Sequence, residues 1–141
     1  MLHNSNTMKE IYEHGSIIRN PVYQRFESMY IDKFARPITD AICEYFECTP
    51  DYFKQRSRKE EIKSVRQIYC YCLQRFGGFG LRQISNLAGY KKDRHETVLH
   101  GIRVIENRLS YIGQNGNRRP LDAWMIKVIF DLELLIKNKS K

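Results

Sequence analysis

Residues 81–112 read LRQISNLAGYKKDRHETVLHGIRVIENRLSYI and are the most informative part of this chain. A short run with apolar residues at helical spacing is followed by a basic turn and by a longer run with the same spacing. Asp93 is a good N-cap, and Glu96 can complete a capping box with it, so we expect the second helix to begin at Arg94. Two helices joined in this way are typical of helix-turn-helix DNA-binding proteins.

The second helix predicted in this stretch has an apolar and a polar face. Its apolar residues should face a core; they are Val98, Ile102, Ile105, Leu109 and Ile112. The residues left to point outward are Arg94, His95, Thr97 and Gly101. In helix-turn-helix proteins the N-terminal part of this outward face contacts the edges of bases.

Charge is distributed unevenly along the 141 residues, which carry a net charge of +8. Residues 1–50 hold five basic and seven acidic side chains, so the rest of the chain carries a net charge of +10. This asymmetry favours a polyanionic partner for the C-terminal two-thirds, although a solvated basic surface would give the same count. The length suits about one domain, and neither disulfides nor metal are needed for its stability.

Cysteine spacing and hydropathy indicate a reducing compartment. The four cysteines form C-x4-C and C-x-C pairs at residues 43, 48, 70 and 72, and neither spacing is a usual zinc signature. We expect Cys72 and Cys43 to behave as small buried hydrophobes. No run approaches the roughly 18 apolar residues of a membrane span, so a cytoplasmic location is predicted.

The remaining sequence predicts helices and no strand. One amphipathic helix is expected within an N-terminal extension, 1–36, and another helix should start at Pro37. Thr49 and Pro50 begin a short helix, and Ser57 with Glu60 should form the capping box of the next, which ends at Gly77-Gly78. We divide the chain into 1–36, a helix-turn-helix domain at 37–112, and a loop with an amphipathic helix at 113–141.

The last helix should follow Pro120 and have a wide apolar face that another surface must cover. That face comprises Leu121, Trp124, Met125, Val128, Ile129, Leu132, Leu135 and Ile136. The helix can cover the core of its own domain, or it can pair with a second copy or with a partner protein.

Residues 54–59, KQRSRK, form a second basic segment immediately before a predicted helix. Positive side chains at a helix start oppose the helix dipole, so phosphate contact explains this cluster better than stability does. Lys63, Arg66 and Gln67 follow one and two turns later. We therefore expect a second contact surface for the same duplex.

From about Pro37 to Leu109 the chain resembles the C-terminal, duplex-binding domain of the bacterial chromosomal replication initiator DnaA. The matching stretches keep the family's order: EYF at 44–46, TPD at 49–51, RSRK at 56–59, VRQ at 65–67 and LRQI at 81–84. The family's signature, GGRDHTTVLH in its usual form, corresponds to residues 89–100. The resemblance implies an all-α bundle with a Trp-repressor-like helix-turn-helix, extended here by N- and C-terminal helices.

The resemblance also implies roles for single residues. Arg58 would enter the minor groove, Arg66 and Gln67 would hold the phosphate backbone, and His95 would meet bases in the major groove. Thr97 would hold a phosphate, and Leu81 with Arg82 would approach the edge of the duplex. The predicted DNA-binding residues are Arg56, Arg58, Lys59, Arg66, Gln67, Leu81, Arg82, Lys91, Lys92, Arg94, His95, Glu96 and Thr97.

The signature departs from the family at positions that read bases. Tyr90-Lys91-Lys92 replaces a tighter turn, Arg94 stands where the family usually has Asp, and Glu96 stands where it has Thr. Arg94 would suit a guanine; Glu96 could accept from a cytosine amine, or it could only complete the capping box. We therefore expect a target other than the family's nine-base-pair box.

Enzyme chemistry is not expected. The G-x-x-x-x-G-K-[ST] loop of the family's ATPase module is absent from these residues, so a freestanding duplex binder without nucleotide is predicted. His95 and His100 lie five residues apart, about 140° round a helix, and cannot share a metal. We expect His100 to pack against the preceding helix, and we expect no cofactor and no metal.

The favoured function is sequence-specific binding of double-stranded DNA in replication or transcription control. The alternative is a non-enzymatic interaction module that kept this fold and binds a protein partner through its terminal helices. Salt-dependent binding to a duplex distinguishes the first from the second.

Overall fold

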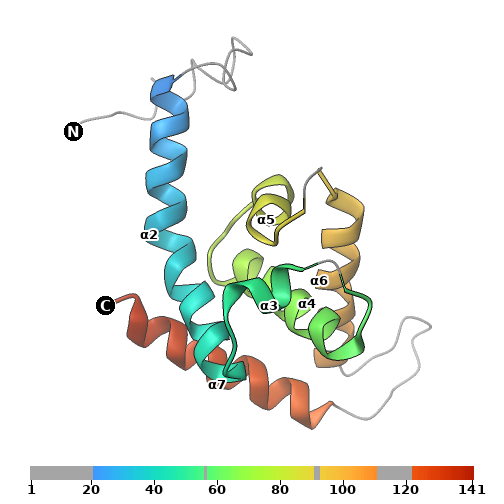
Figure 1. Cartoon of the computed structure of the whole chain (residues 1–141). Coiled ribbons are helices and arrows are strands. Elements are labelled where there is room, and N and C mark those ends of the chain that lie inside the picture. Colours follow the sequence, from blue (N-terminus) through green and yellow to red (C-terminus); the bar gives the residue numbers. More distant parts are fainter. Residues whose placement is uncertain (1–20, 56, 91–92, 111–121) are drawn as a thin grey trace. The chain divides into compact units, whose positions relative to one another are not determined.

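The computed structural model describes residues 21–55, 57–90, 93–110 and 122–141 (Figure 1). Within these ranges the chain forms helices and no strand, which confirms the predicted all-α class. The helices are α2 (Pro21–Phe46), α3 (Pro50–Lys54), α4 (Glu60–Arg75), α5 (Leu81–Leu87), α6 (His95–Leu109) and α7 (Ala123–Lys139). No helix in these ranges has the length and apolar character needed to cross a membrane.

The chain divides into two compact units, residues 1–36 and residues 37–141. The division falls inside α2, which continues through Pro37. The prediction that a helix begins at Pro37 was therefore wrong. Proline is favoured in the first turn because it lacks an N–H, and inside α2 the same property removes one backbone hydrogen bond.

The core of residues 37–141 is built around α4, which packs against α3, α5 and α6. Its largest fully buried side chains are Tyr69, Phe53, Ile38, Ile42, Ile68, Leu73, Ile84, Ile102, Ile105, Met125 and Leu132. Each stabilises the fold by about 1.5–3 kcal/mol through burial of apolar surface. The buried hydroxyl of Tyr69 lies 2.9 Å from the Thr39 hydroxyl, and its ring packs against Phe53.

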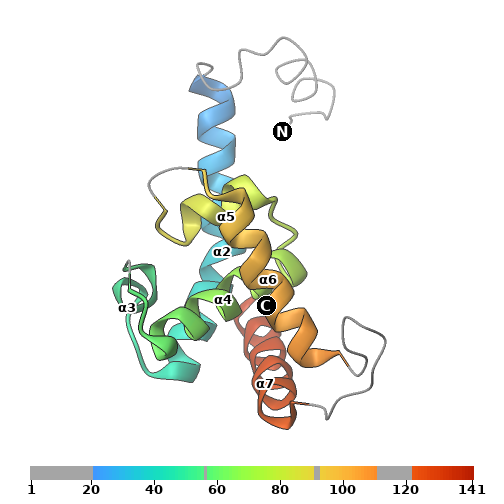
Figure 2. The same cartoon turned by 90° about the vertical axis from the view of Figure 1, so that its right-hand side faces the viewer.

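The helix-turn-helix consists of α5 and α6, which pack against each other and against α4. As predicted, α4 ends before Gly77-Gly78: Gly78 has a positive φ of 69°, and the N–H of Phe79 donates to the Leu73 carbonyl at 3.2 Å. The start of α6 is fixed to α5, because the Arg94 N–H donates to the hydroxyl of the buried Ser85 at 3.0 Å. α6 begins beside α5 and ends beside α7 (Figure 2).

Two predicted capping boxes do not form. α6 begins at His95, one residue later than expected, and Asp93 does not cap it. The Asp93 carboxylate instead lies 3.0 Å from Nε2 of His95. α4 begins at Glu60, and the Ser57 hydroxyl accepts from the Lys59 N–H at 3.2 Å rather than from the first turn.

α7 packs against α6 and against the C-terminal part of α2. Asp122 caps α7 by accepting from the Met125 N–H at 3.0 Å, and its other oxygen accepts from Nε of Arg108 at 2.6 Å. Lys139 pairs with Glu44 at 3.2 Å. Met125, Val128, Ile129, Leu132 and Ile136 of the predicted apolar face are buried, whereas Trp124 is 52% exposed. The prediction for Trp124 was therefore wrong, and the predicted Leu121 lies outside the described residues.

The four cysteines are free thiols. Cys72 and Cys70 are buried, and Cys43 and Cys48 are half-buried. Burial raises the pKa of the Cys43 thiol to about 11 and that of Cys70 to about 12. Cys70 and Cys72 thus pack as small hydrophobic groups, as predicted for Cys72, whereas the prediction that Cys43 is buried was wrong, because Cys43 is only half-buried.

Candidate nucleic-acid interface

Residues 54–59, here called the basic loop, are held against α4 by Arg66. Nη1 of Arg66 donates to the Gln55 carbonyl at 2.7 Å, and Nη2 donates to the Ser57 carbonyl at 3.1 Å. The guanidinium therefore binds the backbone of the loop on two sides of residue 56, which lies outside the described residues. The side chains of Arg58 and Lys59 remain exposed.

Arg66 also reaches the turn between α5 and α6. Its guanidinium carbon lies 6.0 Å from the centre of the Tyr90 ring, at the outer limit of a cation–π contact. Tyr90 is half-buried; burial raises the pKa of its hydroxyl, and the positive charge of Arg66 opposes that rise. One side chain of α4 thus links the basic loop to the helix-turn-helix.

Backbone contact brings the same two segments together at Gly89. This glycine has a positive φ of 88°, and a Cβ placed on it would lie 2.9 Å from the Lys54 carbonyl oxygen. Only glycine fits, because a side chain would meet both an unfavourable backbone conformation and the backbone of residue 54. The turn before α6 therefore packs directly against the end of α3, where the basic loop begins.

A hollow of about 300 Å³ lies between the basic loop and the start of α6. Its lining residues are Lys54, Gln55, Ser57, Arg58, Arg66, Gly89, Tyr90, Arg94 and Thr97. Four of them are basic, and no acidic side chain among the described residues lines it. We call this site the basic hollow. It unites the two segments that the sequence predicted as separate contact surfaces.

The first turn of α6 presents its side chains to solvent. Arg94, His95, Glu96 and Thr97 are all exposed, and 54% of the His95 side chain is accessible beside Asp93. Arg94 occupies the N-cap position without a side-chain hydrogen bond to the turn. The first N–H groups of the helix, which have no partner within the helix, therefore face a surface open to ligands.

Two side chains of α6 lie differently from the prediction. Gly101 was expected to point outward but is buried. It packs so closely against α4 that a Cβ placed on it would lie 3.1 Å from Cγ of Gln67. His100 was expected to pack against α5 but is exposed. The close approach of α4 and α6 at Gly101 turns the face of α6 that carries His100 toward solvent.

The other predicted residues of α4 and α5 do not line the basic hollow, and three predicted residues fall outside the description. Gln67 is half-buried, with its stem against Gly101, and in the first turn of α5 Leu81 is half-buried while Arg82 is exposed. Arg56, Lys91 and Lys92 lie outside the described residues. The described part of the chain contains no group of three or more His, Cys, Asp or Glu side chains able to hold a metal ion.

The residues that hold this arrangement together were not predicted from the sequence. The Ser85 hydroxyl accepts a hydrogen bond from the Arg94 N–H, and the ring of Tyr90 lines the basic hollow. The backbone of Lys54 packs against Gly89. The glycine after α5 was a usable signal, because glycine at this position commonly ends a helix with a positive φ. Nothing in the spacing of Ser85 and Arg94 indicated their contact.

Comparison with known proteins identifies one family that the chain matches. The model described as "Bacterial dnaA protein helix-turn-helix" matches residues 35–105, half of the chain. The chromosomal replication initiator protein DnaA of Bacteroides thetaiotaomicron is 27% identical over 124 residues, which cover 88% of this chain and 23% of that protein. The protein of the same name from Kosmotoga olearia is 40% identical over 58 residues, which cover 41% of this chain and 12% of that protein.

The similarity concerns only part of each relative. The chain spans less than a quarter of the length of these curated relatives. In a third case, the DnaA protein of Pseudothermotoga lettingae, 33% identity extends over 69 residues, 15% of that protein. No solved structure matches the chain.

Proposed function

The chain belongs to the family of bacterial dnaA protein helix-turn-helix domains, and we propose that it binds a specific sequence of double-stranded DNA and so regulates replication or transcription. Membership in the family supports DNA binding. The basic hollow is the observation that carries the proposal, because it joins a basic loop to the exposed first turn of the second helix of a helix-turn-helix.

Contacts to the DNA backbone come from both sides of the basic hollow in this proposal. Arg58 and Lys59 on the loop reach phosphates, or the minor groove beside them. At the start of α6, Thr97 and the uncapped first-turn N–H groups donate to a phosphate oxygen, where the helix dipole favours negative charge. These contacts position the duplex without reading its sequence.

Sequence readout falls to three exposed side chains at the start of α6. In the major groove Arg94 can donate two hydrogen bonds to a guanine, and Glu96 can accept from the amine of a cytosine. Since Asp93 does not cap the helix, a capping box does not account for Glu96. The third side chain is His95, whose imidazole is exposed and whose Nε2 lies 3.0 Å from the Asp93 carboxylate.

Selection of bound fragments from random duplex DNA, followed by titration against salt, tests this proposal. We expect one enriched sequence. With about five phosphates neutralised, the logarithm of affinity should fall with the logarithm of salt concentration at a slope of about −4 to −5. Arg58→Ala should reduce the slope by about 1, and Arg94→Ala should relax preference at one base position.

The matched control is Lys127→Ala, which removes a positive charge from the exposed surface of α7, away from the basic hollow. It should leave both the slope and the preferred sequence unchanged. Failure of the chain to bind any duplex at low salt would refute the proposal, as would equal effects of Arg58→Ala and Lys127→Ala.

A further inference from the structure

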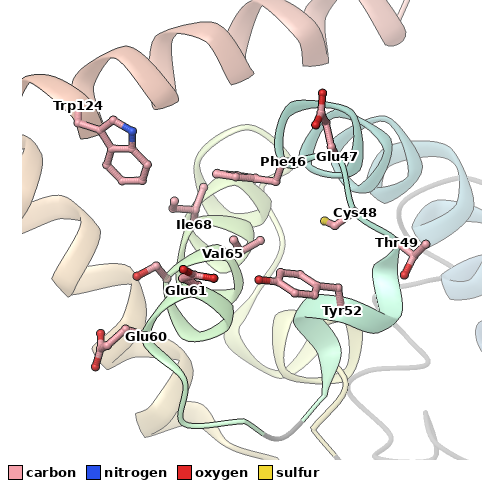
Figure 3. A pocket seen from close by; sticks show the side chains of 11 residues that line it. Phe46, Glu47, Cys48, Thr49, Tyr52, Glu60, Glu61, Val65, Ile68 and Trp124 are labelled. Carbon is pink, nitrogen blue, oxygen red and sulfur yellow. The ribbon is translucent and has the colours of Figure 1, made fainter.

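A second and larger pocket lies in residues 37–141, away from the basic hollow. Its volume is about 700 Å³, and its walls come from the end of α2, from α3, from α4 and from α7 (Figure 3). It shares no lining residue with the basic hollow. We call it the aromatic pocket.

Three aromatic side chains from three different helices form its walls. Figure 3 shows Phe46 and Trp124 on either side of Ile68, and Tyr52 pointing inward from α3 toward Val65. The floor is apolar, since Val65 and Ile68 are buried. The pocket therefore offers apolar side chains a surface on which to pack.

Trp124 is held in place although about half of it is exposed. The guanidinium carbon of Arg108 lies 5.4 Å from the centre of the indole, and Arg108 is itself fixed by its 2.6 Å ion pair with Asp122. The ring thus borders the pocket without needing a bound molecule to order it, which reduces the entropy lost on binding.

Acidic side chains surround the opening. Glu47, Glu60 and Glu61 line the pocket and are exposed, and no basic side chain among the described residues lines it. Lys63 lies 3.9 Å from Glu60. No described cation forms an ion pair with Glu47 or Glu61. This negative opening contrasts with the net charge of +8 on the chain and disfavours a nucleic-acid phosphate.

We propose that the aromatic pocket is a docking site for a basic amphipathic peptide segment of a partner protein. Apolar side chains of the segment pack on Val65, Ile68 and the aromatic walls, while its Lys or Arg side chains meet the three glutamates. Pockets that hold small ligands bury most of the ligand surface. This one has exposed residues along its opening, which suits side chains that project from a longer chain.

Random peptides of about 14 residues, roughly four helical turns, displayed on phage and selected against the full chain, test this inference. Enriched peptides should combine Lys or Arg with large apolar residues. Trp124 is the only tryptophan of the chain, so binding of a synthesised peptide should change its fluorescence, and the affinity should fall as salt is raised.

The double variant Glu60→Gln/Glu61→Gln should weaken binding about tenfold, as expected for the loss of two exposed charge pairs. Glu106→Gln/Glu133→Gln removes two acidic charges elsewhere and should leave the affinity unchanged, with thermal unfolding confirming that both variants fold. The inference is overturned if no peptide is enriched, if enriched peptides lack basic residues, if the two double variants bind alike, or if the Trp124 signal does not change.

Discussion

Arg66 shows how far a single residue can be interpreted from sequence. The family resemblance implied that it holds a phosphate, and in the structure it lines the basic hollow. Both Nη atoms are nevertheless engaged by the carbonyls of Gln55 and Ser57. The sequence predicted where this charge lies, but its hydrogen-bond partners depend on the path of the loop backbone, which no side-chain pattern encodes.

This geometry predicts that Arg66→Ala weakens duplex binding for all sequences alike while the dependence of affinity on salt keeps its slope. The loop loses two hydrogen bonds from a charged group, and the free energy of unfolding should fall by about 1–2 kcal/mol. The measurement is a salt titration of duplex affinity for Arg66→Ala, compared with one for Arg58→Ala, which should lower the slope. A slope reduced by about 1 in Arg66→Ala would mean that Arg66 itself neutralises a phosphate.

Asp122 gives a prediction for the dependence of stability on pH. Its hydrogen bonds from the Met125 N–H and from Arg108 hold the pKa of this carboxyl below its usual value. The unfolded chain therefore binds the proton more tightly, so the stabilisation is present above the usual pKa of about 3.9 and is lost as pH falls through the lowered pKa. Asp122→Ala should cost about 0.5–2 kcal/mol at neutral pH.

Denaturant unfolding of the wild type and of Asp122→Ala between neutral pH and acid checks this effect. The two stabilities should converge as the carboxyl becomes protonated in the wild-type fold. A constant difference over the whole pH range would show that the charge of Asp122 makes no contribution to capping α7.

Among the helices, the apolar periodicity predicted the buried faces better than the capping rules predicted the ends. Val98, Ile102 and Ile105 are buried as expected because the spacing of apolar residues along a helix decides which side meets the core. Asp93 and Ser57 had the correct residue types for caps but find other partners. A cap requires one backbone conformation, and the contacts of the turn with α5 and α3 select a different one.

The turn before α6 gives the sharpest prediction for an element. Gly89→Ala should lower the free energy of unfolding by about 2–4 kcal/mol, because it adds a collision with the Lys54 carbonyl to the strain of a positive φ. Gly78→Ala is the matched control: its φ of 69° is also positive, but a Cβ there meets nothing within 4 Å. Its cost should be about 1–2 kcal/mol. Equal losses measured by denaturant unfolding would contradict the packing of the turn against α3.

The basic hollow and the aromatic pocket carry opposite charges on their described residues. Basic side chains line the hollow between the loop and α6, whereas acidic side chains surround the aromatic pocket. The sequence indicated a basic C-terminal part from its composition. It did not indicate that Phe46, Tyr52 and Trp124 converge, because these residues come from helices whose packing is set by long-range contacts rather than by local spacing.

The decisive question is whether the basic loop and the start of α6 bind one duplex together. Photo-crosslinking groups placed at residue 58 or at residue 96, on the duplex obtained by selection, answer it through the positions of the crosslinked nucleotides. We expect crosslinks from residue 58 in or beside the minor groove and from residue 96 in the adjacent major groove, within about half a helical turn, or five base pairs. Crosslinks from only one of the two positions, or at sites farther apart than the basic hollow can span, would contradict the account.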